Sequence, residues 1–480
     1  MIQDNRAAEI AARLRPRIAG LAPETRLPGV RALSQEFSAS AATVSAALAE
    51  LSALGLVRAE PGRGTFAVGV GETREPDFSW QNQALGSARV DPDRAARLGG
   101  YGSADHLPLS WGYLAPELLP AEELHRLASR AAKQARSWAM TPPTGSPELR
   151  RVVAAPYRAD PNEVIVTPGG QQALVFAMRT LSEPGATLIT ESPSYPGALI
   201  AAQSAGLRLA PVPTDANGIL VDRLEEELRR SRARLIYLQP GFANPTGATL
   251  SAERRARVLE LAAQYGAFII EDDWARHLGI EAQTPPPLFT AALDGHVVSV
   301  LTLSKPASPG LRLGALVARG PAAARLRASR TAEDLGVAPL IQEVALSLLT
   351  SSAWPRHLSR LAQSLAMRRD ALLAALRESL PQARIAAPPR GGLHVWARLP
   401  FGTDTDAVCA AAEDNGVLVG NGRHFFVDEP PAPHLRFSFG AGTPAQFAEG
   451  ARRLGALFSE GSRMHEPSAV EPGYPNAGRI

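Results

Sequence analysis

The chain has 480 residues, of which 45% are hydrophobic and 20% charged, a composition typical of a soluble globular protein with room for several domains. Its single cysteine, Cys409, excludes an internal disulfide framework. There is no signal peptide and no run of about 18 apolar residues, so we expect a cytoplasmic protein without membrane contact. The nine histidines lack metal-ligand spacing, so no metal site is expected, and the net charge of +3 permits nucleic-acid binding without requiring it.

Residues 1–68 predict a small unit of three helices and a hairpin. An apolar residue recurs every four positions from Ile10 to Ile18, which indicates one face of a first helix. A second helix follows, and Ser40 is well suited to cap the N-terminus of a third. Two short strands then flank the glycine-rich tip Pro61–Gly64. This order is typical of a winged helix-turn-helix.

Residues 69–106 mix Gly, Pro, Asp and Arg without periodicity, which predicts a linker that is mobile in part. Residues 107–340 alternate short apolar strands with amphipathic helices, so we expect a mostly parallel sheet covered on both faces. A smaller lobe of strands and helices is predicted over 341–459, and a disordered tail over 460–480. The expected strands of the large sheet are Val164–Val166, Thr187–Thr190, Leu235–Leu238, Phe268–Ile270 and Val297–Val300.

Only two lysines, Lys133 and Lys305, occur in a chain with 48 arginines. A guanidinium stays protonated, whereas a lysine amine can lose its proton and form a Schiff base with an aldehyde. Lys305 follows an apolar strand, which is the place expected for a lysine that binds pyridoxal phosphate. Lys133 lies in a helical surface stretch and is interpreted as solvated charge. The alternative is that both lysines survive by chance in an arginine-rich composition.

Other polar residues follow the predicted strands, and ligands of parallel sheets bind beyond the carboxyl ends of the strands. Gly170 and Gln171 begin a helix where backbone N–H groups can surround a phosphate, although a plain strand-to-helix turn has the same pattern. Tyr195 offers a flat face for an aromatic ring, unless it is only a packed loop residue. Asp272 is placed to hold a pyridine nitrogen protonated, but acids after strands are also common helix caps.

Two arginines complete this set. Arg312, seven residues after Lys305, is a candidate cation for the phosphate. Arg436 is a candidate for bidentate binding of a substrate carboxylate, and the alternative is an ordinary surface arginine of a strand.

Residues 107–458 resemble the fold type I aminotransferases of class I/II. The resemblance rests on two specific segments in this order, Asn244–Gly247 (Asn-Pro-Thr-Gly) and Ser304–Gly314 (Ser-Lys-x-x-x-Pro-Gly-Leu-Arg-Leu-Gly). The first unit is similar to the GntR-type winged helix in Thr25–Pro28, Arg31–Ser34 and Gly62–Phe66. Together the two units resemble MocR-type regulators, a GntR subfamily in which an aminotransferase-like domain serves as the effector module.

The resemblance implies pyridoxal 5′-phosphate (PLP) as the cofactor, bound as an internal aldimine at Lys305. Asp272 would pair with the pyridine nitrogen, Tyr195 would stack on the ring, Asn244 would contact the phenolic oxygen, and Arg436 would take a carboxylate. The phosphate would be surrounded by Gly170, Gln171, Thr302, Ser304 and Arg312. Contacts with double-stranded operator DNA are implied for Arg26, Arg31, Ser40, Ala42, Thr43, Arg63 and Gly64.

The chain departs from the family pattern in four places, one of which is the stretch Ala154–Asp160, which looks shorter than the family helix and loop there. The tyrosine expected two residues after Asp272 is Trp274, which would also contact the cofactor but whose indole N–H cannot accept a hydrogen bond. The tyrosine that one protomer of a homodimer would offer to its partner's phosphate is Met140, before Pro142–Gly145. The third helix lacks the arginine often found near its start, so we expect shape and wing contacts to contribute more to DNA binding.

The sequence therefore predicts a cytoplasmic, homodimeric, DNA-binding regulator that senses PLP, or an amine or amino acid, through the aldimine at Lys305. Two alternatives stay open. One is an aminotransferase with real turnover that carries a DNA-binding domain. The other is a regulator whose degenerate effector domain only dimerises.

Overall fold

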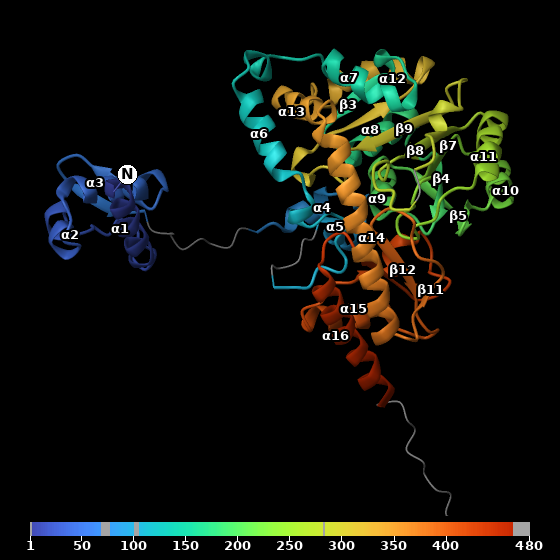
Figure 1. Cartoon of the computed structure of the whole chain (residues 1–480). Helices are drawn as coiled ribbons and strands as arrows, with labels where there is room; N and C mark the ends of the chain where they lie inside the picture. The colour runs from blue at the N-terminus through green and yellow to red at the C-terminus, as the bar shows by residue number, and fades with distance from the viewer. Residues whose placement is uncertain (1, 69–76, 100–104, 282–283, 464–480) are drawn as a thin grey trace, which may run out of the picture. The chain divides into compact units, whose positions relative to one another are not determined.

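A computed structural model of the chain describes residues 2–68, 77–99, 105–281 and 284–463 (Figure 1). The chain divides into two compact units, Met1–Ser87 and Ala88–Ile480. Each unit has a hydrophobic core of its own.

The first unit is a three-helix bundle with a two-stranded wing. Leu33, Val44 and Leu51 are among the buried residues that join its helices. The Ser40 hydroxyl accepts a hydrogen bond from the Thr43 N–H at 3.1 Å and so caps the third helix, as predicted. The winged helix-turn-helix arrangement expected from the sequence is present, as α1 (Ile2–Ala19), α2 (Val30–Glu36), α3 (Ala41–Ala53), β1 (Val57–Glu60) and β2 (Gly64–Ala67).

Two helices occupy the described part of the predicted linker, α4 (Ser79–Ala84) and α5 (Pro92–Gly99). The second of them packs against α9 (Pro196–Ser204) and so belongs to the second unit. Residues 69–76 and 100–104 of that segment lie outside the described residues. The stretch predicted as a linker therefore contributes an ordered helix to the larger unit.

The second unit is built on an eight-stranded sheet with the order β3-β10-β9-β8-β7-β4-β5-β6. All five strands expected from the sequence are present, and β5, β4, β7, β8 and β9 pair in parallel. The mostly parallel sheet is thus confirmed, although β10 is inserted antiparallel between β3 and β9. The strands are β3 (Val164–Thr167), β4 (Thr187–Ser192), β5 (Arg208–Asp215), β6 (Gly218–Ile219), β7 (Leu235–Leu238), β8 (Phe268–Asp272), β9 (Val297–Thr302) and β10 (Gly314–Val317).

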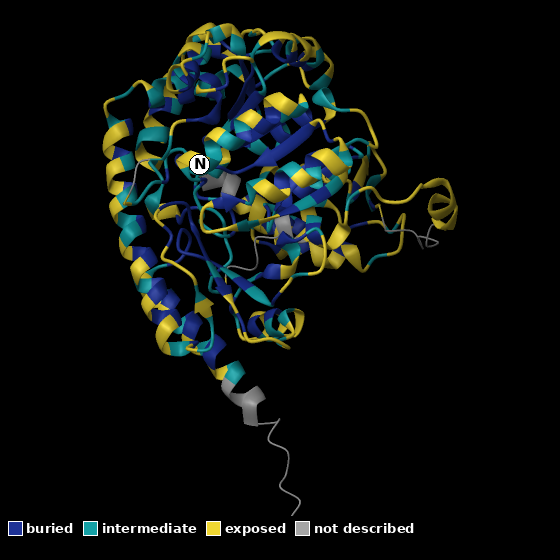
Figure 2. Cartoon of the chain, turned by 90° about the vertical axis from the view of Figure 1, so that its right-hand side faces the viewer, coloured by how far each residue is buried: buried dark blue, intermediate teal, exposed yellow. Residues whose placement is uncertain are grey.

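Helices cover both faces of this sheet because successive strand residues point to opposite sides. In β8, Ile269 joins one apolar cluster and Ile270 joins the other. Figure 2 shows the buried strands in dark blue beneath helices whose outer sides are exposed. On the side of Ile269 lie α6 (Ala121–Ala132), α7 (Pro147–Ala154), α10 (Val221–Ser231), α11 (Ala252–Tyr265) and α13 (Pro339–Leu349); on the side of Ile270 lie α8 (Gly170–Leu181), α9 and α12 (Gly320–Glu333).

The smaller C-terminal lobe contains a four-stranded antiparallel sheet with the order β11-β12-β14-β13. Its last helix runs to Arg463, four residues beyond the predicted end of the lobe, and the rest of the predicted tail lies outside the described residues. No helix in the described part of the chain is long and apolar enough to span a membrane. The lobe comprises α14 (Ala353–Ser379), β11 (Arg384–Ile385), β12 (His394–Arg398), α15 (Thr405–Asp414), β13 (Gly420–Asn421), β14 (His434–Ser438) and α16 (Pro444–Arg463).

Candidate functional site

One cavity of about 430 Å³ gathers every residue that the sequence assigned to the cofactor and its substrate. Most of these residues follow the carboxyl ends of strands of the large sheet, and one lies in the small lobe. Because parallel strands end at the same edge, side chains distant in sequence meet there. The predicted residues that line the cavity are Gly170, Gln171, Tyr195, Asn244, Asp272, Trp274, Thr302, Ser304, Lys305, Arg312 and Arg436.

Lys305 follows β9 and points its amine at a segment before the first strand of the sheet. The Nζ atom donates to the Gly112 carbonyl at 2.7 Å and lies 3.5 Å from the centre of the Tyr113 ring. Burial, with the nearby Arg436 cation, lowers the pKa of Lys305 from 10.5 to about 7. Near neutral pH much of this amine is therefore in its unprotonated, nucleophilic form. Lys133 is exposed at the end of α6, in agreement with its interpretation as solvated charge.

A small hollow lies at the N-terminus of α8, walled by Gly170, Gln171, Thr302, Ser304 and Arg312, and we call it the phosphate hollow. A Cβ atom on Gly170 would lie 3.3 Å from Thr302 Cβ, so a larger residue would fill the space. The Ser304 hydroxyl is buried and has no hydrogen-bond partner among the described residues. The N-terminus of α8, an unpaired hydroxyl and a guanidinium fit a phosphate, because a helix N-terminus favours negative charge.

Asp272 ends β8 and holds its carboxylate against the cavity. Its Oδ2 atom accepts hydrogen bonds from the Tyr237 hydroxyl at 2.7 Å and from Gln239 Nε2 at 2.8 Å. Burial raises the pKa of Asp272 from 3.8 to about 6, against the opposing effect of these two donors. A protonated pyridine nitrogen opposite this carboxylate would stabilise its charged form, so the site fits such a ring.

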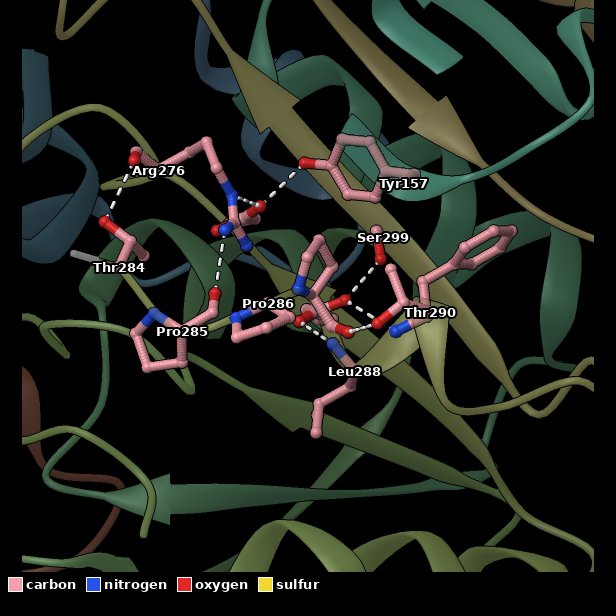
Figure 3. Close-up of polar contacts among 12 residues, drawn as sticks. Tyr157, Arg276, Thr284, Pro285, Pro286, Leu288, Thr290 and Ser299 are labelled. Atoms are coloured by element: carbon pink, nitrogen blue, oxygen red, sulfur yellow. Dashed lines mark hydrogen bonds and ion pairs between the residues drawn. The ribbon is translucent and has the colours of Figure 1, made fainter. Parts of the chain in front are cut away.

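The two acids that flank Asp272 are used elsewhere. Burial raises the pKa of Glu271 to about 7 and also raises the pKa of Asp273. Figure 3 shows their partners, which are Tyr157, Ser299 of β9, and Arg276 and Leu288 of the loop that joins β8 to β9. Asp272 is the acid of this triplet that lines the cavity. Glu271 accepts from the Leu288 N–H and the Ser299 hydroxyl, and Asp273 accepts from the Tyr157 hydroxyl and Arg276 Nε.

Arg436 reaches the cavity from β14. Its guanidinium donates to Asn244 Oδ1 at 3.2 Å and to the Ser110 carbonyl at 2.6 Å. Its Nε atom is buried without a partner among the described residues, and burial lowers the pKa of the side chain from 12.5 to about 10. Tyr195 stands nearby, with its hydroxyl donating to Gln171 Oε1 at 3.2 Å. A cation with a spare donor beside an aromatic face suits a carboxylate.

The two unusual residues have different surroundings. Trp274 is buried in the cavity wall and stacks on His394, with ring centroids 5.6 Å apart and planes 24° apart. Its indole N–H has no partner in the described part of the chain. Met140 is 94% exposed and does not line the cavity. The cavity therefore remains open with tryptophan at this position.

Several cavity residues were missed by the sequence reasoning. Gln239 directly follows β7, so the rule that selected Asp272 would also have found it. Gly112 and Tyr113 precede every strand of the large sheet, and His394 begins a strand of the small lobe, so no rule of strand ends points to them. The residues that line the cavity and were missed include Arg94, Trp111, Gly112, Tyr113, Gln239 and His394. Tyr237 was also missed; it does not line the cavity but donates a hydrogen bond to Asp272.

The residues predicted to contact DNA lie on three features of the first unit. Ser40, Ala42 and Thr43 lie at the start of α3, and the Ser40 and Thr43 hydroxyls are 2.8 Å apart. Arg31 is exposed on α2. At the wing, Arg63 forms an ion pair with Glu60 at 2.6 Å, and the Arg26 side chain lies against Gly64, whose φ is +124°.

The cavity and the bundle correspond to two known families. A family model described as aminotransferase class I and II matches residues 112–454. The chain belongs to this family. A model of the gntR family of bacterial regulatory proteins matches residues 6–67. This member of the class I and II aminotransferase family therefore carries a GntR-type domain, which is the organisation predicted from its resemblance to MocR-type regulators, and its fold is that of a PLP-dependent family.

Relatives extend over nearly the whole of this aminotransferase-family chain. It is 27% identical to the uncharacterized HTH-type transcriptional regulator YdfD of Bacillus subtilis, over 91% of this chain and 92% of the relative. It is also 27% identical to the probable rhizopine catabolism regulatory protein MocR of Rhizobium meliloti, over 91% and 90%. The crystal structure of LysN, an alpha-aminoadipate aminotransferase from Thermus thermophilus complexed with N-(5′-phosphopyridoxyl)-L-leucine, is 31% identical. It matches with a TM-score of 0.73 and covers 81% of this chain and 100% of that one.

Proposed function

We propose that the chain is a cytoplasmic, homodimeric transcriptional regulator that binds operator DNA with its first unit. Its second unit responds to PLP, or to an amine or amino acid that competes with Lys305 for PLP. The observation that carries this proposal is a GntR-type unit joined to a cavity in which a buried lysine amine, the Asp272 carboxylate and the phosphate hollow occur together.

The roles of the cavity residues follow from their chemistry. PLP, when bound, supplies an aldehyde that condenses with amines and a ring that withdraws electrons. Asp272 would hold the ring nitrogen protonated, Tyr195 would cover one face of the ring, and Asn244 would contact the ring oxygen. The phosphate hollow would take the phosphate, and Arg436 would take the carboxylate of an amino acid.

Lys305 is linked to the small lobe through the segment that contains Gly112. Its amine donates to the Gly112 carbonyl, and residues on both sides of Gly112 form backbone hydrogen bonds with the small lobe. A change of partner for the amine would release one contact of this segment, which biases a two-state arrangement of the lobes. The segment is tied by Leu107 N–H to the Gly416 carbonyl at 2.8 Å, by Ser438 N–H to the Leu109 carbonyl at 2.6 Å, and by Ala115 N–H to the Gly440 carbonyl at 2.8 Å.

A working aminotransferase is the second candidate. Its support is the full set of cavity residues and the similarity to LysN, which is named as an aminotransferase. Repeated turnover of an amino donor with a keto acid would favour this function. A spectral shift on amine addition without turnover favours the sensor. A colourless protein that takes up no PLP would favour the third hypothesis, in which the second unit only dimerises.

The deciding experiment measures DNA affinity by fluorescence anisotropy, on the DNA upstream of the gene for this chain, with and without PLP. We expect PLP to change the affinity of the wild-type chain and of Lys133→Ala, which lacks the other lysine, by the same factor. Lys305→Ala should bind DNA but should not respond to PLP. An equal response of Lys305→Ala would contradict the proposal.

A further inference from the structure

The wing of the first unit carries an acid that the roles given above do not use. Glu60 is the last residue of β1 and pairs across the hairpin with Gly64. Its side chain is 24% exposed, whereas the Arg63 side chain beside it is 75% exposed. In the proposed function this hairpin meets DNA, whose backbone is a dense row of negative charges. A carboxylate at this place therefore opposes the binding that the neighbouring arginines favour.

Two arginines share the Glu60 carboxylate. The Nη1 atom of Arg63 donates to Glu60 Oε2 at 2.6 Å. The Nη2 atom of Arg58 lies 3.1 Å from the other oxygen, Oε1. Each oxygen of the carboxylate thus faces one guanidinium. In the chain without DNA, the most exposed of these two cations, Arg63, is therefore already engaged by an anion of its own hairpin.

Arg58 is held by a second acid, and Arg63 is not. The Nη2 atom of Arg58 also donates to Glu24 Oε1 at 3.0 Å and to Glu24 Oε2 at 2.8 Å. Glu24 is fixed to the wing, because its N–H donates to the Ala67 carbonyl of β2 at 2.9 Å. If Arg63 leaves Glu60, Arg58 remains as the counter-charge of this carboxylate. The wing can therefore release Arg63 more easily than Arg58.

Arg26 is a contrasting cation of the same wing. It is exposed, its backbone pairs with Phe66 of β2, and its side chain lies across Gly64, where an added Cβ atom would be 2.8 Å from Arg26 Nε. The ion pairs of the wing formed by described residues join Arg58 and Arg63 to Glu24 and Glu60 and do not include Arg26. Arg26 can therefore reach a phosphate without giving up a carboxylate, whereas Arg63 cannot.

We propose that Glu60 is an intramolecular competitor of the DNA backbone: its carboxylate holds Arg63 in the free chain, and a phosphate takes its place in the complex. This inference rests on the proposed function, which supplies the DNA. The exchange is possible because both contacts are of one kind, a guanidinium donating to an anionic oxygen. An exposed ion pair is weak, so Glu60 lowers the affinity for DNA of any sequence without preventing binding.

The first arm of the test measures binding of the full-length chain, without added PLP, to a mixed-sequence duplex at low salt by fluorescence anisotropy. Glu60→Gln keeps the shape of the side chain and removes its charge, so it should tighten binding by roughly 2- to 5-fold, the strength of an exposed ion pair. Glu9→Gln is the matched control. It removes the same charge from an exposed glutamate of α1 that is also paired with an arginine three positions away, Arg6 at 3.1 Å, and should leave the affinity close to that of the wild type.

The second arm introduces Arg63→Gln or Arg26→Gln into the wild type and into Glu60→Gln. Arg63→Gln should cost more affinity in the Glu60→Gln background, where Arg63 has no competing carboxylate, and Arg26→Gln should cost the same factor in both. Equal costs of Arg63→Gln in the two backgrounds, or equal affinities of the wild type and Glu60→Gln, would overturn the competitor role alone. If the wild type and every variant bind no duplex, the proposed function fails, and this inference fails with it.

Discussion

The amine of Lys305 determines how this chain would capture its cofactor, and its acidity is set by its neighbours. Only the unprotonated amine attacks an aldehyde, and burial with the Arg436 charge lowers the pKa of Lys305 to about 7. We therefore expect the rate of PLP capture by the cofactor-free chain, followed by absorbance, to rise with pH and level off above about pH 7. Arg436→Gln removes a cation that favours the neutral amine, so the midpoint should move to higher pH. Lys133→Ala should leave it in place, and an unchanged midpoint in Arg436→Gln would contradict this electrostatic account.

At the same scale, the sequence predicted the residues that follow strands and missed those that do not. Lys305 and Asp272 were found because a strand end is visible as an apolar run that stops at a polar residue. Tyr113 and His394 reach the cavity from a loop and from another lobe, so only the tertiary fold brings them there. Arg94 was hidden for another reason, since its stretch of the chain shows no apolar periodicity, and both the packing of α5 on α9 and the contact of Arg94 with the Phe426 carbonyl depend on the tertiary fold.

At the scale of elements, buried acids at the ends of strands make the large sheet sensitive to pH. Glu191 in β4 accepts the Gln239 N–H at 2.8 Å, and burial raises the pKa of Glu191 from 4.5 to about 8. The folded state then holds this proton more tightly than the unfolded state. The stability that this provides is present below about pH 4.5 and is lost as the pH rises to about 8.

Glu191→Gln keeps the acceptor oxygen and carries no charge, so this loss should disappear. We expect the Tm of Glu191→Gln to exceed that of the wild type by more at pH 9 than at pH 5, with roughly 1.4 kcal/mol for each unit of pKa shift as the upper bound. Differential scanning fluorimetry measures the difference. The exposed Glu226→Gln is the control and should show the same difference at both pH values. A difference for Glu191→Gln that does not change with pH would refute this role.

The sequence was most informative on elements with strong periodicity. The five expected strands are short runs of mostly apolar residues that are buried by the helices on both faces of the sheet, and the first unit has regular apolar spacing in its helices. The antiparallel strand β10 is only four residues long and begins two residues after Arg312, so its short apolar run was not recognised as a separate strand. Its position between β3 and β9 depends on long-range pairing, which local sequence does not encode.

For the whole molecule, DNA binding by the first unit must be measured in the full chain, because the cavity lies in a separate compact unit. Arg31 on α2 and Arg63 at the wing are exposed cations of the first unit. If both neutralise phosphates, Arg31→Ala with Arg63→Ala should weaken DNA binding and reduce the slope of log affinity against log salt by about 1.8, since each phosphate contact contributes about 0.9. Arg229→Ala with Arg230→Ala removes the same charge from ion pairs on the exposed α10 and should leave the slope unchanged. Equal slopes for both double variants would mean that net charge, rather than contacts of the winged helix, governs the affinity.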